Sequence, residues 1–380
     1  MSYQSKLKVQ KIVMSIISYT CFMFLGGFVG FFAVNLEKEM GLEINGLNTF
    51  VVILVCLIIV FLWYYISLCL HEIGHLIFGL ISGYTFSSIR FGSLMISKEN
   101  GKIQFSRFIL PGTGGQCIME PPKRNPEEMP VFLYNTGGLF VNLFLSIISG
   151  LIAYYTSGLV FLMSISFSLM NTIAMILNGI PFSQIGNDGA NTIILCRNKK
   201  ARAAFYNTLK VVELTSKEVN LRDMPKELFE YNKEDTLDNP IITSQAVNYF
   251  NYLLNTEQYQ QAMEMADYIL DNASSINQIH ETLLQAERMY ISAVINRDMD
   301  MAESIYKKNK KSFKVFSKFI SIQRCLYAYY SLVNIDEKKR DQYKKQFLKT
   351  VKTYPYKVDA QNEQRLFDLV EYVQHDEKKL

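Results

Sequence analysis

Residues 68–78 read LCLHEIGHLIF and lie inside an apolar run, residues 50–82, in which Glu72 is the one charged side chain apart from the histidines. An ionisable residue in a membrane segment costs roughly 2.5–3.5 kcal/mol on insertion scales, so its presence points to function. On a helix, His71 and His75 are four positions apart and share a face, where both imidazoles can bind one metal ion. The stretch therefore predicts a metal site inside a membrane helix.

The hydrophobic residues are concentrated in the first half of the chain. The sequence is 49% hydrophobic, with a mean hydropathy of +0.08, and everything after about residue 197 is rich in charged and amide side chains. Four apolar runs reach the roughly 20 residues that span a bilayer. They are residues 12–34, 50–82, 132–155 and 158–180. We expect a membrane half followed by a soluble half, with the first run retained because no A-x-A cleavage site follows it.

The distribution of lysine and arginine predicts the orientation in the membrane. Basic residues lie before residue 12, between residues 83 and 131, and after residue 196, whereas the loop at residues 35–49 has one lysine and three glutamates. With four spans, the basic regions all fall on one side, which the positive-inside rule assigns to the cytosol. We expect a multi-pass protein of the cell membrane, in contact with the lipid bilayer, with both termini cytosolic.

The predicted fold is mainly α. Three segments are expected: an N-terminal transmembrane helix with an outer loop (residues 1–45), a membrane-embedded core (residues 46–198) and a cytosolic helical domain (residues 199–380). Within the core, alternating β-favouring residues on both sides of KENG (residues 98–101) predict a small β-hairpin at about residues 84–109.

The C-terminal segment has apolar residues at helical spacing throughout. Tyr259, Ala262, Ala266 and Leu270 resemble the second helix of a tetratricopeptide repeat, and a plain helical bundle remains an equal alternative. Such a domain can bind a protein partner. No basic stripe with interleaved aromatics is present in the sequence, so we expect no nucleic-acid binding. The six cysteines form no CxxC pair and are interpreted as reduced, packed thiols.

The stretch His71-Glu72-Ile73-Gly74-His75 is an HExxH motif. In zinc hydrolases of this pattern, the glutamate after the first histidine takes a proton from the attacking water. The alternatives are a polar packing cluster or a proton relay. Zinc also needs a third protein ligand and an open position.

Asp188 is the candidate third ligand. It is the only acid between residues 129 and 210, and it follows a segment that Pro181 interrupts. Irregular backbone at membrane depth is tolerated where protein or a water-filled cavity covers it. The alternative is that Asp188 caps the next helix, and the two roles can coexist.

A third motif lies in the run at residues 132–155, where Gly138 and Asn142 form G-x-x-x-N. Glycine permits close helix approach, and a buried asparagine must find hydrogen bonds. The alternative interpretation is helix packing alone.

HExxH in a membrane helix, then G-x-x-x-N, then a proline-broken segment that ends in Asp-Gly resembles the site-2 protease family of intramembrane zinc metalloproteases. The resemblance covers about residues 50–195. It implies a three-helix catalytic core with one zinc ion. His71, His75 and Asp188 match the metal ligands, and Glu72 matches the catalytic base.

Asn142 matches the family's third-helix asparagine, which implies a role in positioning the substrate or the oxyanion. The chain departs from the family pattern at Asn187, where leucine is usual, and in lacking the proline of the second motif. Residues 83–131 are too few for a PDZ module.

The resemblance implies a zinc endopeptidase that hydrolyses bonds in or beside membrane-spanning segments. The substrate would be a membrane-inserted protein or peptide: a membrane regulator, or a precursor of a signal, pheromone or bacteriocin peptide. A metal or proton transporter that uses the same His/Glu/Asp cluster is the alternative. A catalytically silent scaffold is a third possibility, which the intact Glu72 disfavours.

Overall fold

The structure is a computed structural model. The parts of the chain that it describes are residues 3–39, 41, 46–99, 101–109, 113–182, 186–233, 235–274 and 276–377. Two compact units are present. The membrane unit comprises Met1–Gly92, Gly114–Pro122 and Pro130–Asn198, and the C-terminal unit comprises Ser93–Thr113, Lys123–Met129 and Lys199–Leu380.

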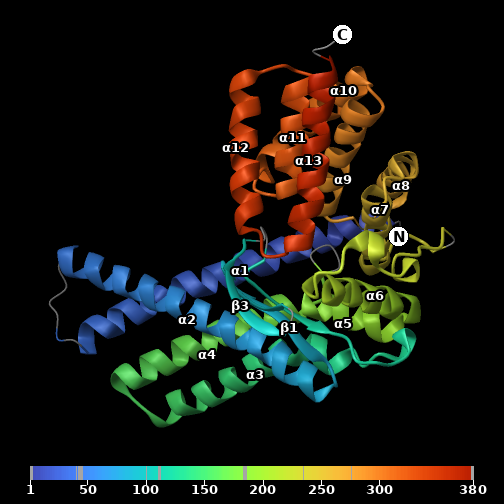
Figure 1. Ribbon diagram of the computed structural model, residues 1–380. Coiled ribbons are helices and arrows are strands. Elements are labelled where there is room, and N and C mark those ends of the chain that lie inside the picture. The colour runs from blue at the N-terminus through green and yellow to red at the C-terminus, as the bar shows by residue number, and fades with distance from the viewer. Residues whose placement is uncertain are drawn as a thin grey trace. The chain divides into compact units, whose positions relative to one another are not determined.

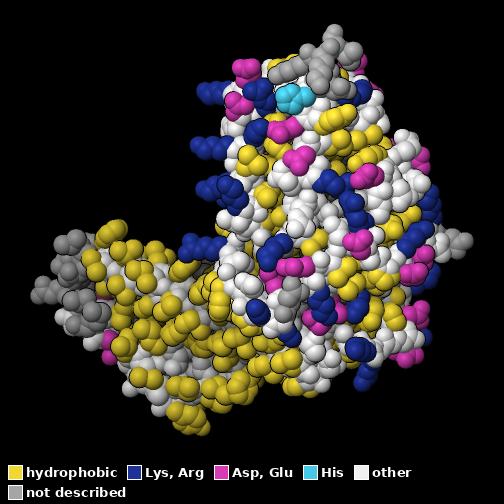
Figure 2. Space-filling view, in the orientation of Figure 1, with side chains coloured by type: hydrophobic (Ala, Val, Ile, Leu, Met, Phe, Trp, Pro, Cys, Tyr) yellow, Lys and Arg dark blue, Asp and Glu magenta, His cyan; other side chains and the backbone are white. Residues whose placement is uncertain are grey.

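Long apolar helices form the membrane unit (Figure 1). They are α1 (Tyr3–Glu39), α2 (Gly46–Ile81), α3 (Phe132–Tyr155) and α4 (Gly158–Gly179), followed by the short α5 (Asp188–Arg197). In space, α3 packs against α2, α4 and α5, and α1 contacts α2 and α4. Figure 2 shows that hydrophobic side chains cover most of the visible surface of this unit, as expected for helices that face lipid.

Three helices among the described residues are long and apolar enough to cross a membrane: Phe50–Ile81, Pro126–Tyr155 and Gly158–Gly179. They correspond to the predicted spans at residues 50–82, 132–155 and 158–180. The remaining predicted span, residues 12–34, lies within α1, and several of its side chains lie outside the described residues. The expectation of a mainly α membrane protein is confirmed.

Hydroxyl groups join α3 to α4 inside the apolar packing. Ser146 Oγ and Thr172 Oγ1 are 2.6 Å apart, and Ser168 Oγ donates to the Ser146 carbonyl at 2.7 Å. On the neighbouring pair of helices, Trp63 of α2 donates its indole N–H to Ser166 Oγ of α4 at 3.0 Å. In a lipid environment, where apolar burial between helices gains little, such small polar contacts help to fix the packing.

The small sheet is larger than the predicted hairpin at residues 84–109. It contains β1 (Thr85–Phe91), β2 (Leu94–Glu99), β3 (Lys102–Arg107) and β4 (Gly115–Glu120) in the order β3-β2-β1-β4. β2 pairs with β3 and β1 pairs with β4, both antiparallel. The chain turns at Gly92, which has a positive φ of 60°, so the predicted first strand is divided in two. The predicted KENG turn connects β2 to β3, and its Asn100 lies outside the described residues.

The C-terminal unit is helical apart from β2 and β3. Its α-helices are α6 (Lys199–Ser216), α7 (Pro240–Asn255), α8 (Tyr259–Asn272), α9 (Gln278–Tyr290), α10 (Met299–Val315), α11 (Ile320–Leu332), α12 (Glu337–Thr353) and α13 (Lys357–Glu377). Short 3₁₀ helices lie at Pro126–Glu128, Leu221–Asp223 and Lys226–Leu228. A short π-helix continues α9 over Ile291–Ile295.

Successive helices of this unit pack on one another from α6 to α13. Ala262, Ala266 and Ala302 are fully buried where the helices meet. These small side chains are compatible with the tetratricopeptide-like pairing, which stays a prediction. Charged side chains are spread over the visible surface of the unit (Figure 2), as for a domain that faces water.

Candidate active site

The helix α2 carries the three residues of the first motif on its buried side. His71, Glu72 and His75 are 5%, 7% and 7% exposed. Because they lie in the last three turns of a long, regular helix, their relative positions follow from helical geometry alone. The two imidazoles meet edge to face, with ring centroids 4.8 Å apart.

Asp188 reaches the histidines from the first residue of α5. The N-cap of this helix is Asn187, whose Oδ1 accepts from the Ala190 N–H at 3.2 Å. Asn187 Nδ2 also donates to the carbonyls of Leu177 and Ile180, at 2.9 and 2.6 Å, so the end of α4 is tied to the start of α5. The alternative that Asp188 caps the helix is therefore wrong, and its carboxylate is free to point at the histidines.

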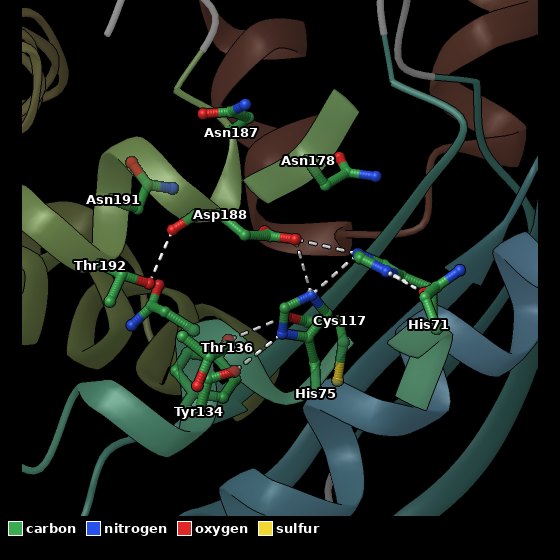
Figure 3. A network of polar contacts seen from close by, with 12 residues as sticks. His71, His75, Cys117, Tyr134, Thr136, Asn178, Asn187, Asp188, Asn191 and Thr192 are labelled. Atoms are coloured by element: carbon green, nitrogen blue, oxygen red, sulfur yellow. Dashed lines mark hydrogen bonds and ion pairs between the residues drawn. The ribbon is translucent and has the colours of Figure 1, made fainter. Parts of the chain in front are cut away.

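Three ligand atoms converge on one point (Figure 3). His71 Nε2 lies 2.9 Å from Asp188 Oδ2, His75 Nε2 lies 3.3 Å from the same oxygen, and the two Nε2 atoms are 3.2 Å apart. A tetrahedral zinc ion with bonds of about 2.0–2.1 Å holds its ligand atoms about 3.3 Å from one another. The spacing of the three atoms fits a zinc ion with a fourth position left open.

Hydrogen bonds at the far side of each imidazole fix its tautomer. His71 Nδ1 lies 2.7 Å from Asn142 Oδ1, and His75 Nδ1 lies 2.7 Å from the backbone carbonyl of Tyr134. Both oxygens accept only, so each Nδ1 carries a proton, and Nε2 is the ring nitrogen that can bind a metal ion. Metal-binding histidines are oriented in this way, by a second hydrogen bond from the other ring nitrogen.

The G-x-x-x-N motif of α3 provides one of these contacts. A Cβ at Gly138 would lie 2.5–2.6 Å from the ring atoms of His71, so only glycine leaves room for the imidazole against α3. Asn142, one turn later and 0% exposed, then reaches the ring nitrogen. The motif thus contacts His71 of the candidate metal site directly, and helix packing alone does not account for these contacts.

Glu72 lies beside β4, an edge strand of the sheet. A Cβ at Gly115 would fall 2.5 Å from Glu72 Oε1, which shows how close the β4 backbone comes to the carboxylate. The prediction of a hairpin at residues 84–109 did not include this strand. The Glu72 carboxylate is therefore next to the backbone of an edge strand.

The structure brings together every residue that the sequence singled out for the site. His71, His75 and Asp188 form the candidate metal site, with Glu72 adjacent and Asn142 behind His71. Two further contributors are the Tyr134 carbonyl and Asn171, which bonds Asn142. A backbone carbonyl cannot be predicted from residue type, and the sequence shows Asn171 only as one amide side chain within an apolar run.

The combination of membrane-type helices, an HExxH helix and a carboxylate from a distant segment is typical of membrane metallopeptidases. The sequence model of Peptidase family M50 matches residues 57–341, most of the chain, and the protein belongs to this family, the site-2 proteases. The match extends well beyond residue 195, where the resemblance in the motifs ends. Comparisons with curated proteins and with solved structures gave no match. The chain is a protease, and the family recognised from its motifs is confirmed.

Proposed function

We propose that the protein is an intramembrane zinc endopeptidase that hydrolyses peptide bonds in or beside membrane-spanning segments. The convergence of His71 Nε2, His75 Nε2 and Asp188 Oδ2 inside an apolar helical unit carries this proposal. Two imidazoles and one carboxylate, with a position left open, are a donor set of catalytic zinc sites. Membership of a peptidase family favours this activity over the transporter alternative.

Zinc bound by these ligands would supply Lewis acidity, which polarises the scissile carbonyl and makes water nucleophilic near neutral pH. The chain's own residues hold the metal-binding atoms in place and move the proton. Glu72, buried beside the ligands, takes the proton of the attacking water and returns it to the leaving amine. Asp188 and the two histidines keep their ligand atoms aimed inward through the contacts described above.

The substrate must present an extended backbone at this site, because carbonyls in a helix are already hydrogen-bonded within it. The β4 edge next to Glu72 can receive an unwound segment by adding it as a further strand. The substrate class we propose is a membrane regulator, or the precursor of a signal, pheromone or bacteriocin peptide. We further propose that both termini are cytosolic and that the helical domain at residues 199–380 binds a protein partner.

Cleavage of a membrane-tethered reporter tests the proposal. Glu72→Gln is expected to lower cleavage at least 100-fold or so, the usual scale for a lost general base, while zinc remains bound. His71→Ala should abolish both cleavage and zinc binding. Glu37→Gln, which neutralises another buried carboxylate of the membrane unit, is the matched control and should cleave normally.

Full cleavage by the Glu72→Gln protein would contradict the assigned mechanism. Comparison of membrane peptides from cells with the wild-type protein and with Glu72→Gln identifies the substrate, because its fragments appear only with the active enzyme.

A further inference from the structure

Asn171 lies in the middle of α4, outside the three motifs, and is 0% exposed. Its amide joins two elements of the site. Asn171 Nδ2 donates to the Phe167 carbonyl at 2.9 Å, and Asn171 Oδ1 accepts from Asn142 Nδ2 at 3.1 Å. Asn142 Oδ1 in turn accepts from His71 Nδ1 at 2.7 Å. A chain of three hydrogen bonds therefore connects a backbone carbonyl of α4 to a metal ligand.

The direction of this chain follows from which groups can donate. The Phe167 carbonyl only accepts, so the NH₂ of Asn171 faces it and the oxygen of Asn171 faces Asn142. The NH₂ of Asn142 must then point at Asn171, which leaves its oxygen for His71. With an oxygen opposite, His71 carries its proton on Nδ1 and keeps Nε2 free.

We propose that Asn171 is a positioning residue for the metal site: it orients the Asn142 amide, and through it the tautomer of His71. The proposal rests on the proposed function, because it takes His71 as a metal ligand. Without Asn171 the Asn142 amide can turn over and present its NH₂ to the imidazole. The ring would then accept at Nδ1 and carry its proton on Nε2, where it blocks metal binding.

The structure offers a matched control for a purely mechanical role in helix packing. Ser146 and Thr172 form a partly buried hydrogen bond between the same two helices, α3 and α4, at 2.6 Å and bond none of the candidate ligands. Thr172→Val removes that bond with almost no change in shape. If Asn171 only held the helices together, the two substitutions would have similar effects on the metal site.

The experiment uses the full-length protein in detergent, with Glu72→Gln as the parent so that no self-cleavage occurs. Zinc affinity is measured by competition with a chelator, and ligand geometry by the visible absorption of bound Co²⁺. Loss of an outer hydrogen-bond partner typically weakens metal binding 10–100-fold. We expect a loss on this scale for Asn171→Leu, with a changed Co²⁺ spectrum, and parental affinity for Thr172→Val.

Two further variants separate orientation from structure. Asn171→Asp keeps an acceptor for Asn142 and should bind zinc within a few-fold of the parent. The double variant Asn142→Asp/Asn171→Leu should recover most of the lost affinity, because a carboxylate accepts from His71 with either oxygen and needs no orienting partner. Where leucine prevents folding, Asn171→Ala carries the same expectation.

Parental affinity and spectrum in Asn171→Leu would overturn the proposal, as would a double variant no better than Asn171→Leu. The proposed function fails by a different result, namely if the parent protein binds no more zinc than its His71→Ala derivative. The two failures are thus distinguishable, since the first leaves His71-dependent zinc binding intact in the parent.

Discussion

At the scale of single residues, each imidazole of the site is held by contacts at both of its ring nitrogens. His71 and His75 face Asp188 with Nε2, and each gives its Nδ1 proton to an acceptor on α3. The HExxH spacing determines that the two rings share a helix face. It does not determine which nitrogen of each ring faces Asp188, because that depends on acceptors from another helix.

Gly138→Ala tests the close approach of His71 to α3. The added methyl group would lie 2.5–2.6 Å from the imidazole, well inside van der Waals contact, and must displace the ring. We expect zinc affinity to fall by about 10-fold or more, the scale for a disturbed outer contact of a ligand. Gly30→Ala in α1, where a Cβ would meet nothing within 4 Å, is the control. If Gly138→Ala keeps the zinc affinity of the parent in competition with a chelator, the close packing of His71 against Gly138 is refuted.

At the scale of elements, the connection from α4 to α5 decides whether the third ligand reaches the site. The chain leaves helical geometry at Ile180, before Pro181, and resumes it at Asp188. Asn187 bridges the gap with four hydrogen bonds: its Oδ1 accepts from the N–H groups of Phe182 and Ala190, and its Nδ2 donates to two carbonyls at the end of α4. An asparagine in place of the family's usual leucine is explained by these four contacts.

Asn187→Ala is expected to loosen the start of α5, because it removes the cap and the bonds to Leu177, Ile180 and Phe182. Loss of an N-cap typically costs about 1 kcal/mol. Amide exchange in α5 should quicken, and zinc affinity should fall because Asp188 is no longer held in place. Asn191→Ala, which removes a side-chain bond to the Gly186 carbonyl in the same region, is the control. Equal zinc affinities for the two variants would contradict this assignment.

At the scale of the whole molecule, the two units are built on different principles. The membrane unit turns large apolar side chains outward, whereas the C-terminal unit contains a buried charge cluster. Arg324 is 0% exposed, bonds Glu287 at 2.5 Å and Glu363 at 2.6 Å, and lies 4.4 Å from the Tyr290 ring centre. A buried guanidinium is tolerated because carboxylates and an aromatic face surround it.

Arg324→Met should destabilise the C-terminal unit strongly. Removing one partner of a buried ion pair costs roughly 3–5 kcal/mol, because the remaining carboxylates stay buried without compensation. Thermal exposure of the buried Cys325, detected by thiol labelling and mass spectrometry, should shift down by on the order of 10 °C.

The exposed pair of Lys357 with Glu218 provides the control for this prediction. Lys357→Met should change the free energy of unfolding by less than about 1 kcal/mol. Zinc affinity of the membrane unit should be unchanged in both variants if the two units fold independently. A parallel loss of zinc in Arg324→Met would show that the units are coupled.

Much of this protein was predictable from local pattern alone. Apolar runs of bilayer length determined the membrane helices, and helical geometry placed His71, Glu72 and His75 on one side of α2, because both signals depend only on residues close in sequence. The prediction of a hairpin was incomplete for the same reason. The alternation of apolar and polar residues reveals neither the turn at Gly92 nor the pairing of β4 with β1.

The tertiary structure alone decided what completes the site. It brought Asp188 to His71 across 117 positions, placed β4 beside Glu72, and linked Asn171 through Asn142 to the same imidazole. These contacts join different helices and strands, so they depend on how the elements pack and not on their own periodicity. The sequence determined by itself which side chains could bind a metal, and the packing of α2, α3, α4 and α5 on one another decided which atoms of those side chains face one another.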